Sequence, residues 1–103
     1  MIIRLGMAPR LPETSFLEFQ NHWKTSHADA AKKIPGILGY TQNHALLVNE
    51  KPVFPYPGFD ACSELIFLNT AEMDEGFSSE EYLEAVRADE DEFVDKSRFS
   101  FAL

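Results

Sequence analysis

Two of the three histidines and the only tryptophan of this chain lie in one short stretch, from Phe19 to Asn43. A helix that begins after Ser15 and continues to about Ile34 places the imidazole of His27 on its apolar side, at roughly 100° per residue. The apolar stripe contains Phe16, Phe19, Trp23, His27, Ala30 and Ile34. Histidine has a pKa of about 6.5, and burial lowers that pKa. A core-facing His27 is therefore expected to be a neutral base that can remove a proton from an acidic carbon or a phenol.

The second histidine of the stretch, His22, lies roughly 140° around the same helix from His27. We therefore expect His22 at the edge of the apolar face, where it could contact substrate, and we do not expect the two histidines to share a metal ion or a proton. The chain has no His-Glu-x-x-His motif, paired cysteines, glycine-rich phosphate loop or Gly-x-Ser-x-Gly motif. The sequence thus predicts no metal and no cofactor.

Tyr40 and Asn43 could each donate a hydrogen bond to an enolate that forms beside His27. They lie on opposite faces of an expected strand, so they are alternatives unless a bulge intervenes. Glu64 or Asp60 could orient the imidazole or assist proton transfer.

Each of these residues also has a structural interpretation. A histidine on an apolar helix face is often a hydrogen-bonded core residue, which is the alternative for His27. Glu64 could instead pair with Arg4 or Arg98 of a neighbouring strand. Phe19 and Trp23 are typical core residues that could also line a pocket. Tyr56 lies in a proline-rich loop, residues 49–59, that either binds ligand or packs its aromatic rings beneath the surface.

The pattern of elements predicts a fold. Ser15 and Glu18 resemble a capping box, and Pro35 with Gly36 ends the first helix. Ile3, Leu5 and Met7 alternate with polar or small residues, as in a half-buried strand. We expect strands at 2–7, 37–48, 61–68 and 98–103, a main helix at 15–34, a helical turn at 71–76 and a second main helix at 79–95. The order is that of the α+β ferredoxin-like βαββαβ sandwich, with two main helices on one face of a four-stranded antiparallel sheet.

The other face of this sheet also carries apolar residues and needs a partner. Two sheets packed face to face in a homodimer, a dimeric α+β barrel, would bury that face. Each protomer would then keep a pocket between its sheet and its helices, suited to a small hydrophobic or aromatic ligand.

Composition excludes several classes of function. The 103 residues suit one domain, 1–103. A net charge of −8, with most acids in residues 70–95, argues against nucleic acid, and we interpret that acidic run as a solvated helix face. No apolar run approaches the roughly 20 residues that span a membrane. Cys62 is the single cysteine and no signal peptide is evident, so a cytoplasmic location is expected.

Several motifs together resemble the EthD family of the dimeric α+β barrel superfamily. They are Phe19-x3-Trp23-x3-His27, His22 before Trp23, Ile34-Pro35-Gly36, Tyr40-x-Gln42-Asn43, Phe59-Asp60-Ala61, Glu64-Leu65-Ile66-Phe67 and Ala88-Asp89-Glu90 with Phe93. The resemblance covers nearly the whole chain and implies the same fold and dimer. It also implies that His27 stands where the working histidine of a methylmuconolactone methylisomerase stands, while that enzyme's cysteine aligns nearer Leu65 than Cys62.

The residues and the resemblance favour a small cofactor-independent enzyme. Its reaction would be proton transfer by His27, as an isomerase, cyclase, dehydratase or decarboxylase, on an aromatic, polyketide-like or lactone substrate. One alternative is an EthD-type oxidoreductase, either a cofactor-free monooxygenase or an accessory to an oxidase. The other is a dimer that binds a small molecule without catalysis.

Overall fold

The computed structural model describes residues 1–103 and contains one four-stranded antiparallel sheet. The central strands are β1 (Ile2–Ala8) and β5 (Ala61–Phe67), which pair along their whole length. The edge strands are β2 (Gly39–His44), on β5, and β6 (Ser100–Ala102), on β1. The strand order β2-β5-β1-β6 is that of the ferredoxin-like fold, so the predicted fold class is confirmed.

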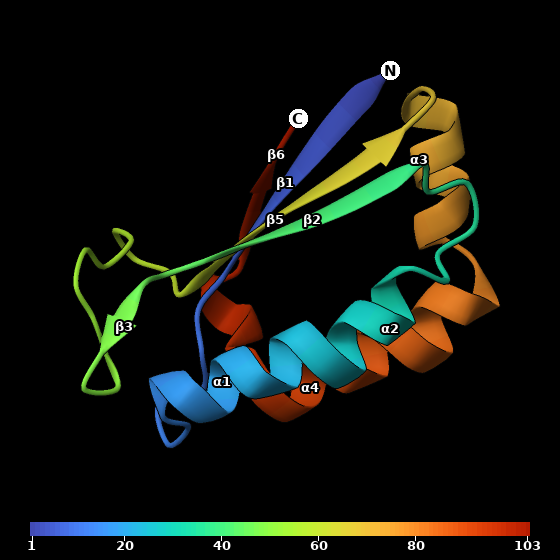
Figure 1. Cartoon of the computed structure of the whole chain (residues 1–103). Helices are drawn as coiled ribbons and strands as arrows, with labels where there is room; N and C mark the ends of the chain where they lie inside the picture. Colours follow the sequence, from blue (N-terminus) through green and yellow to red (C-terminus); the bar gives the residue numbers. More distant parts are fainter.

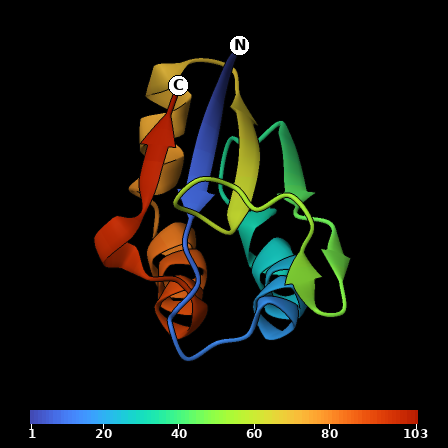
Figure 2. The ribbon, with the colours of Figure 1, turned by 90° about the vertical axis from the view of Figure 1, so that its left-hand side faces the viewer.

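The helices cover one face of this sheet (Figure 1). The first helical rod is α1 (Phe16–His22), a π-helical turn η1 (Trp23–His27) and α2 (Ala28–Ala31). The second rod is a π-helical segment η2 (Tyr82–Arg87) followed by α4 (Ala88–Phe93), and it lies beside the first (Figure 2). Helix α3 (Thr70–Phe77) packs at the far end of the sheet, and a 3-10 turn η3 (Lys96–Arg98) precedes β6.

Local signals explain where the first rod begins and ends. The amide of Glu18 donates to the Ser15 side chain, which confirms the predicted cap. The rod ends at Ala31, three residues before the predicted end, because Lys33 and Ile34 donate three residues back, to Ala30 and Ala31, in a tighter turn. Gly36, at φ 81°, then reverses the chain.

The predicted strand 37–48 and the predicted loop 49–59 differ from the structure. The strand breaks after His44, and a separate hairpin follows, made of β3 (Leu47–Val48) and β4 (Lys51–Pro52). Asn49 and Glu50 both have positive φ, which is the geometry of a two-residue hairpin turn. Pro52 is tolerated because β4 is a short edge strand.

Strand parity puts a charged residue of β1 under the helices. Arg4, Gly6 and Ala8 face the helices, whereas Ile3, Leu5 and Met7 face the uncovered side of the sheet. The predicted apolar set is thus the outward one. Ile3 is 45% exposed, in keeping with an apolar outer face that no element of the chain covers.

The core consists of two separate clusters of buried side chains. One contains Phe19, Trp23, Ala61, Phe93 and Val94, and the other contains Ile34, Leu65, Phe67, Met73 and Val86. The interior is therefore not one continuous packing unit. None of the helices is long and apolar enough to cross a lipid bilayer.

The inward direction of Phe67, the last residue of β5, can be tested against Leu68, which follows the strand. Phe67 is 0% exposed and faces the helices, whereas Leu68 is 57% exposed. We expect Phe67→Ala to lower the free energy of unfolding by about 3–5 kcal/mol, the usual cost of emptying an aromatic core site. Leu68→Ala should change it by no more than about 0.5 kcal/mol. Urea unfolding at one fixed protein concentration measures both, and equal losses would contradict the assigned faces.

Candidate functional site

The π-helical turn η1 brings His22 and His27 to the same partner. The amide of Ala28 donates five residues back, to the carbonyl of Trp23, so this turn contains more residues than an α-helical turn. The angular separation of residues 22 and 27 around the helix axis is consequently smaller than the roughly 140° of a regular helix. The predicted separation of roughly 140° is wrong for this reason, whereas the prediction that the two histidines share no metal ion or proton stays a prediction.

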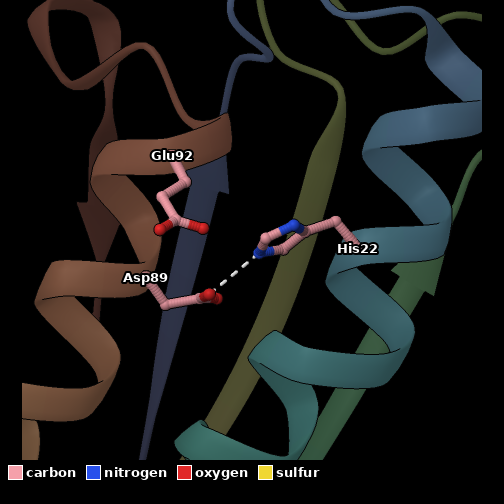
Figure 3. Close-up of side chains that lie close together, drawn as sticks. All are labelled: His22, Asp89 and Glu92. Carbon is pink, nitrogen blue, oxygen red and sulfur yellow. Dashed lines mark hydrogen bonds and ion pairs between the residues drawn. The ribbon is translucent and has the colours of Figure 1, made fainter.

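The shared partner is the carboxylate of Asp89, on α4. Its Oδ2 lies 2.9 Å from Nδ1 of His27, and its Oδ1 lies 2.9 Å from Nε2 of His22. Figure 3 shows the bond between His22 and Asp89, which links the two helical rods. Asp89 is a carboxylate acceptor, so it fixes the His27 tautomer with the proton on Nδ1.

Burial defines the state of His27. The residue is 8% exposed, and this burial lowers the pKa of its imidazole, while Asp89 acts in the opposite direction. The ring of Phe93 stands 5.1 Å from that of His27 and 4.3 Å from that of His22. His27 therefore presents an unprotonated Nε2, which makes no hydrogen bond within the protein.

A cavity of about 40 Å³ lies beside His27, where the two core clusters meet. It has room for little more than a water molecule or two. The free volume is about 440 Å³ when the open space at the cavity mouth is included. Its lining is mostly apolar and comprises Arg4, Ala8, His27, Ala31, Ile34, Tyr40, Ser63, Leu65, Phe77, Val86, Glu90, Val94 and Phe99.

Tyr40 lies in this cavity lining as a poised hydrogen-bond donor. Gln42 Nε2 donates to the Tyr40 hydroxyl at 2.9 Å and to the Trp23 carbonyl at 2.7 Å. Because the Tyr40 oxygen already accepts a bond, its own hydrogen is free for a ligand. Burial raises the pKa of the Tyr40 hydroxyl, so it keeps that hydrogen at neutral pH.

Glu90 adds an acid to the same cavity. Burial raises the pKa of its carboxyl, and Lys96 and Arg4 partly offset that effect. The acidic run was interpreted as a solvated face, and for Asp89 and Glu90 that interpretation is wrong. Both are half-buried, and they lie three and four residues after Val86 and before Phe93, on the core-facing stripe.

The structure separates Asn43 and Glu64 from His27. Asn43 Nδ2 donates to Glu64 Oε2 at 2.9 Å, and both side chains lie on the uncovered face of the sheet. Glu64 therefore pairs with neither Arg4 nor Arg98. Of the two predicted enolate donors, Tyr40 is the one that shares the cavity with His27.

The other candidate binding residues lie outside the cavity lining. Asp60 accepts the amide of Arg10 at 2.8 Å and thereby holds the end of β1. Tyr56 stacks on Phe59 at 5.0 Å, in the loop beyond β4. Phe19 and Trp23 are buried in the first core cluster. They support the site from behind, because Phe19 contacts Phe93 and the Trp23 carbonyl holds Gln42.

One group of side chains could offer ligands to a metal ion. Donor atoms of His22, Asp89 and Glu92 lie within 4.8 Å of one another (Figure 3). Glu92 is exposed, and the donors of His22 and Asp89 already bond each other. The hydrogen-bonded arrangement therefore accounts for this cluster without an ion, and the prediction of no metal stays a prediction.

His44, Asp89, Glu90 and Arg4 had roles that local sequence reasoning missed. His44 stacks on Trp23 at 4.5 Å and bonds to Gln42 Oε1 at 2.9 Å. The signal for the two acids was their spacing from Val86 and Phe93. For Arg4 no signal existed, because β1 is apolar or small on both faces.

The fold and the cavity define a ferredoxin-like α+β protein with a His-Asp pair at an internal pocket. Residues 11–97 match the EthD domain, and the chain therefore belongs to the EthD family. The predicted family is confirmed. No curated protein sequence matches the chain.

Solved structures show the same fold at low sequence identity. An EthD family protein from Bacillus halodurans C-125 is 18% identical with a TM-score of 0.72, over 99% of this chain and 95% of that one. A dimeric protein of unknown function and ferredoxin-like fold from Bacteroides fragilis is 13% identical, with a TM-score of 0.61 over 97% and 88% of the two chains. A putative antibiotic biosynthesis monooxygenase from Bacteroides thetaiotaomicron is 15% identical, with a TM-score of 0.57 over 96% and 82%.

The contact between Asp89 and His27 predicts how the pKa of His27 changes when Asp89 is replaced. In Asp89→Asn the negative charge that favours the imidazolium of His27 is lost, so the pKa of His27 should fall further below its ordinary value. The pKa of His44 is lowered by burial and by Lys24, not by Asp89, and it should not move. Imidazole proton signals followed by NMR against pH test both, and an unchanged His27 titration would contradict the proposed pairing.

Proposed function

We propose that the protein is a cofactor-independent enzyme in which the His27-Asp89 pair moves a proton of a carbonyl compound. The observation that carries the proposal is a buried imidazole whose Nδ1 is held by a carboxylate and whose Nε2 is unpartnered beside a cavity. This arrangement is that of a general base with an orienting acid. The EthD family membership agrees with a small enzyme.

The residues of the cavity suggest a sequence of steps. His27 Nε2 takes a proton from the carbon next to a substrate carbonyl, and Asp89 stabilises the imidazolium that forms. The electron pair of that C–H bond moves to the carbonyl oxygen, where the Tyr40 hydroxyl donates a hydrogen bond to the enolate. His27 then returns the proton to another carbon, which gives an isomer. Atoms and charge balance without an oxidant or a cofactor.

Two other functions remain candidates. A monooxygenase reaction has support in the name of the Bacteroides thetaiotaomicron protein, whose fold this chain shares. In that case the carbanion at the same site would react with oxygen. A non-catalytic binding dimer is the third candidate. The dimeric Bacteroides fragilis structure and the apolar outer face that includes Ile3 support a homodimer for each of the three functions.

Substitution of His27 tests the base directly. Exchange of the acidic protons of muconolactone and anthrone for deuterium, followed by NMR in D₂O, should be fast with the wild type. We expect it to be about 10²–10⁴-fold slower with His27→Gln, the usual contribution of a general base. Tyr40→Phe should slow it about 10²–10³-fold, as loss of one oxyanion donor does. Tyr56→Phe is the matched control for Tyr40→Phe, because Tyr56 stacks on Phe59 in the loop beyond β4 and does not line the cavity.

The alternatives give different results in the same assay. Oxygen uptake with anthrone that depends on His27 would favour the monooxygenase. Binding of both compounds without exchange, with affinity unchanged in His27→Gln, would favour the binding protein. Full exchange by a folded His27→Gln variant would rule out the base.

The pH dependence of exchange has a defined sign. Burial lowers the pKa of His27. As the pH falls, the imidazole therefore stays neutral past about 6.5, the ordinary histidine pKa, and becomes protonated only at a lower pH. We expect kcat/KM to be constant through that pH and to fall only as the pH drops through the lowered pKa. In Asp89→Asn this acidic limb should move to still lower pH. A limb above pH 6.5 would contradict the assignment of His27 as the base.

A further inference from the structure

Arg4 is a charged side chain that makes no direct ion pair in the protein, although Glu90 acts on it electrostatically from the same cavity. Its guanidinium stands 4.5 Å from the ring centre of Phe77, 4.6 Å from that of Phe101 and 5.7 Å from that of Phe99. It takes part in none of the ion pairs or side-chain hydrogen bonds of the chain. Five N–H donors are therefore held among aromatic rings with no acceptor from the protein.

Arg4 lies at the boundary between two hollows of the molecule and lines both of them. Arg4 and Phe77 line the inner cavity beside His27, and they also line an outer hollow of about 300 Å³. The remaining lining of the outer hollow is Met73, Asp74, Tyr82, Leu83, Arg87 and Phe101. The inner cavity alone is too small for an organic substrate, whereas typical ligand pockets begin at about 300 Å³. A substrate that reaches His27 from the outer hollow must pass the guanidinium.

The charges around Arg4 leave room for a bound anion. Glu90 is the acid that lines the inner cavity with Arg4, and it makes no ion pair with it. Asp74 and Arg87 are the charged residues of the outer hollow besides Arg4, and their formal charges cancel. A carboxylate matches the planar fork of a guanidinium and accepts two of its N–H groups.

We propose that Arg4 binds a carboxylate of the substrate, so that the cavity takes carboxylic acids that carry an apolar ring. This inference rests on the proposed function for the identity of the reacting site. It adds the class of substrate and names Arg4 as a binding residue. The rings of Phe77 and Phe101 hold the guanidinium between the two hollows, so the substrate carboxylate is bound there, at the passage from the outer hollow to the cavity of His27.

A matched pair of unreactive probes tests the proposal. We expect 2-naphthoate to bind the wild type about 10–100-fold more tightly than 2-naphthamide, as charge-assisted hydrogen bonds to arginine imply. Isothermal titration calorimetry measures both. In Arg4→Gln the preference for the acid should disappear while 2-naphthamide still binds. Arg87→Gln is the matched control and should keep the preference, because Arg87 lines only the outer hollow.

Each other outcome has a defined meaning. Equal binding of the two probes by the wild type, no binding of 2-naphthoate at millimolar concentration, or a preference that depends on Arg87 instead of Arg4 would overturn the proposal. If Arg4→Gln does not fold, Arg4→Lys gives the test, and it should retain a weaker preference for the acid. His27→Gln should keep the full preference. If the protein proves not to be an enzyme, the preference for 2-naphthoate over 2-naphthamide is still expected. The two proposals therefore fail separately.

Discussion

The carboxylate of Asp89 joins the two helical rods and sets the state of the imidazole beside the cavity. One oxygen accepts from His22 and the other from His27, so both rods are held at a fixed separation and rotation. Two features must coincide for this contact. The π-turn η1 must rotate His22 and His27 to one side, and Asp89 must lie on the inner stripe of α4. An α-helical turn in place of η1 would remove one of the two bonds.

The cavity favours the uncharged form of the groups that could exchange protons in it. Burial lowers the pKa of His27 and raises the pKa values of Tyr40 and Glu90, so each shift moves away from the ionised form. Arg4 is the exception, since a guanidinium stays protonated at any physiological pH. The site thus combines neutral donors and acceptors with one fixed positive charge. It exists because the two core clusters do not merge.

Much of the fold could be predicted from the sequence because its signals are local. The cap at Ser15, the stop at Pro35-Gly36 and the strand alternation each depend on neighbouring residues. The position of His27 beside a cavity also followed from helical spacing. The His22-Asp89 contact did not, because nothing in residues 23–27 distinguishes a π-turn from an α-turn. The inward direction of Arg4 was hidden because strand β1 carries apolar or small residues on both faces.

The alternation of the sheet has a consequence for how this protein can change. Cavity-lining residues of β5, such as Ser63 and Leu65, alternate with Cys62, Glu64 and Ile66, which point to the opposite side. A single layer of backbone therefore separates the cavity from the uncovered face of the sheet. Substitutions at Ile3 or Ile66 can remodel that face without replacing a side chain of the cavity, so the two sides of the sheet are free to evolve independently.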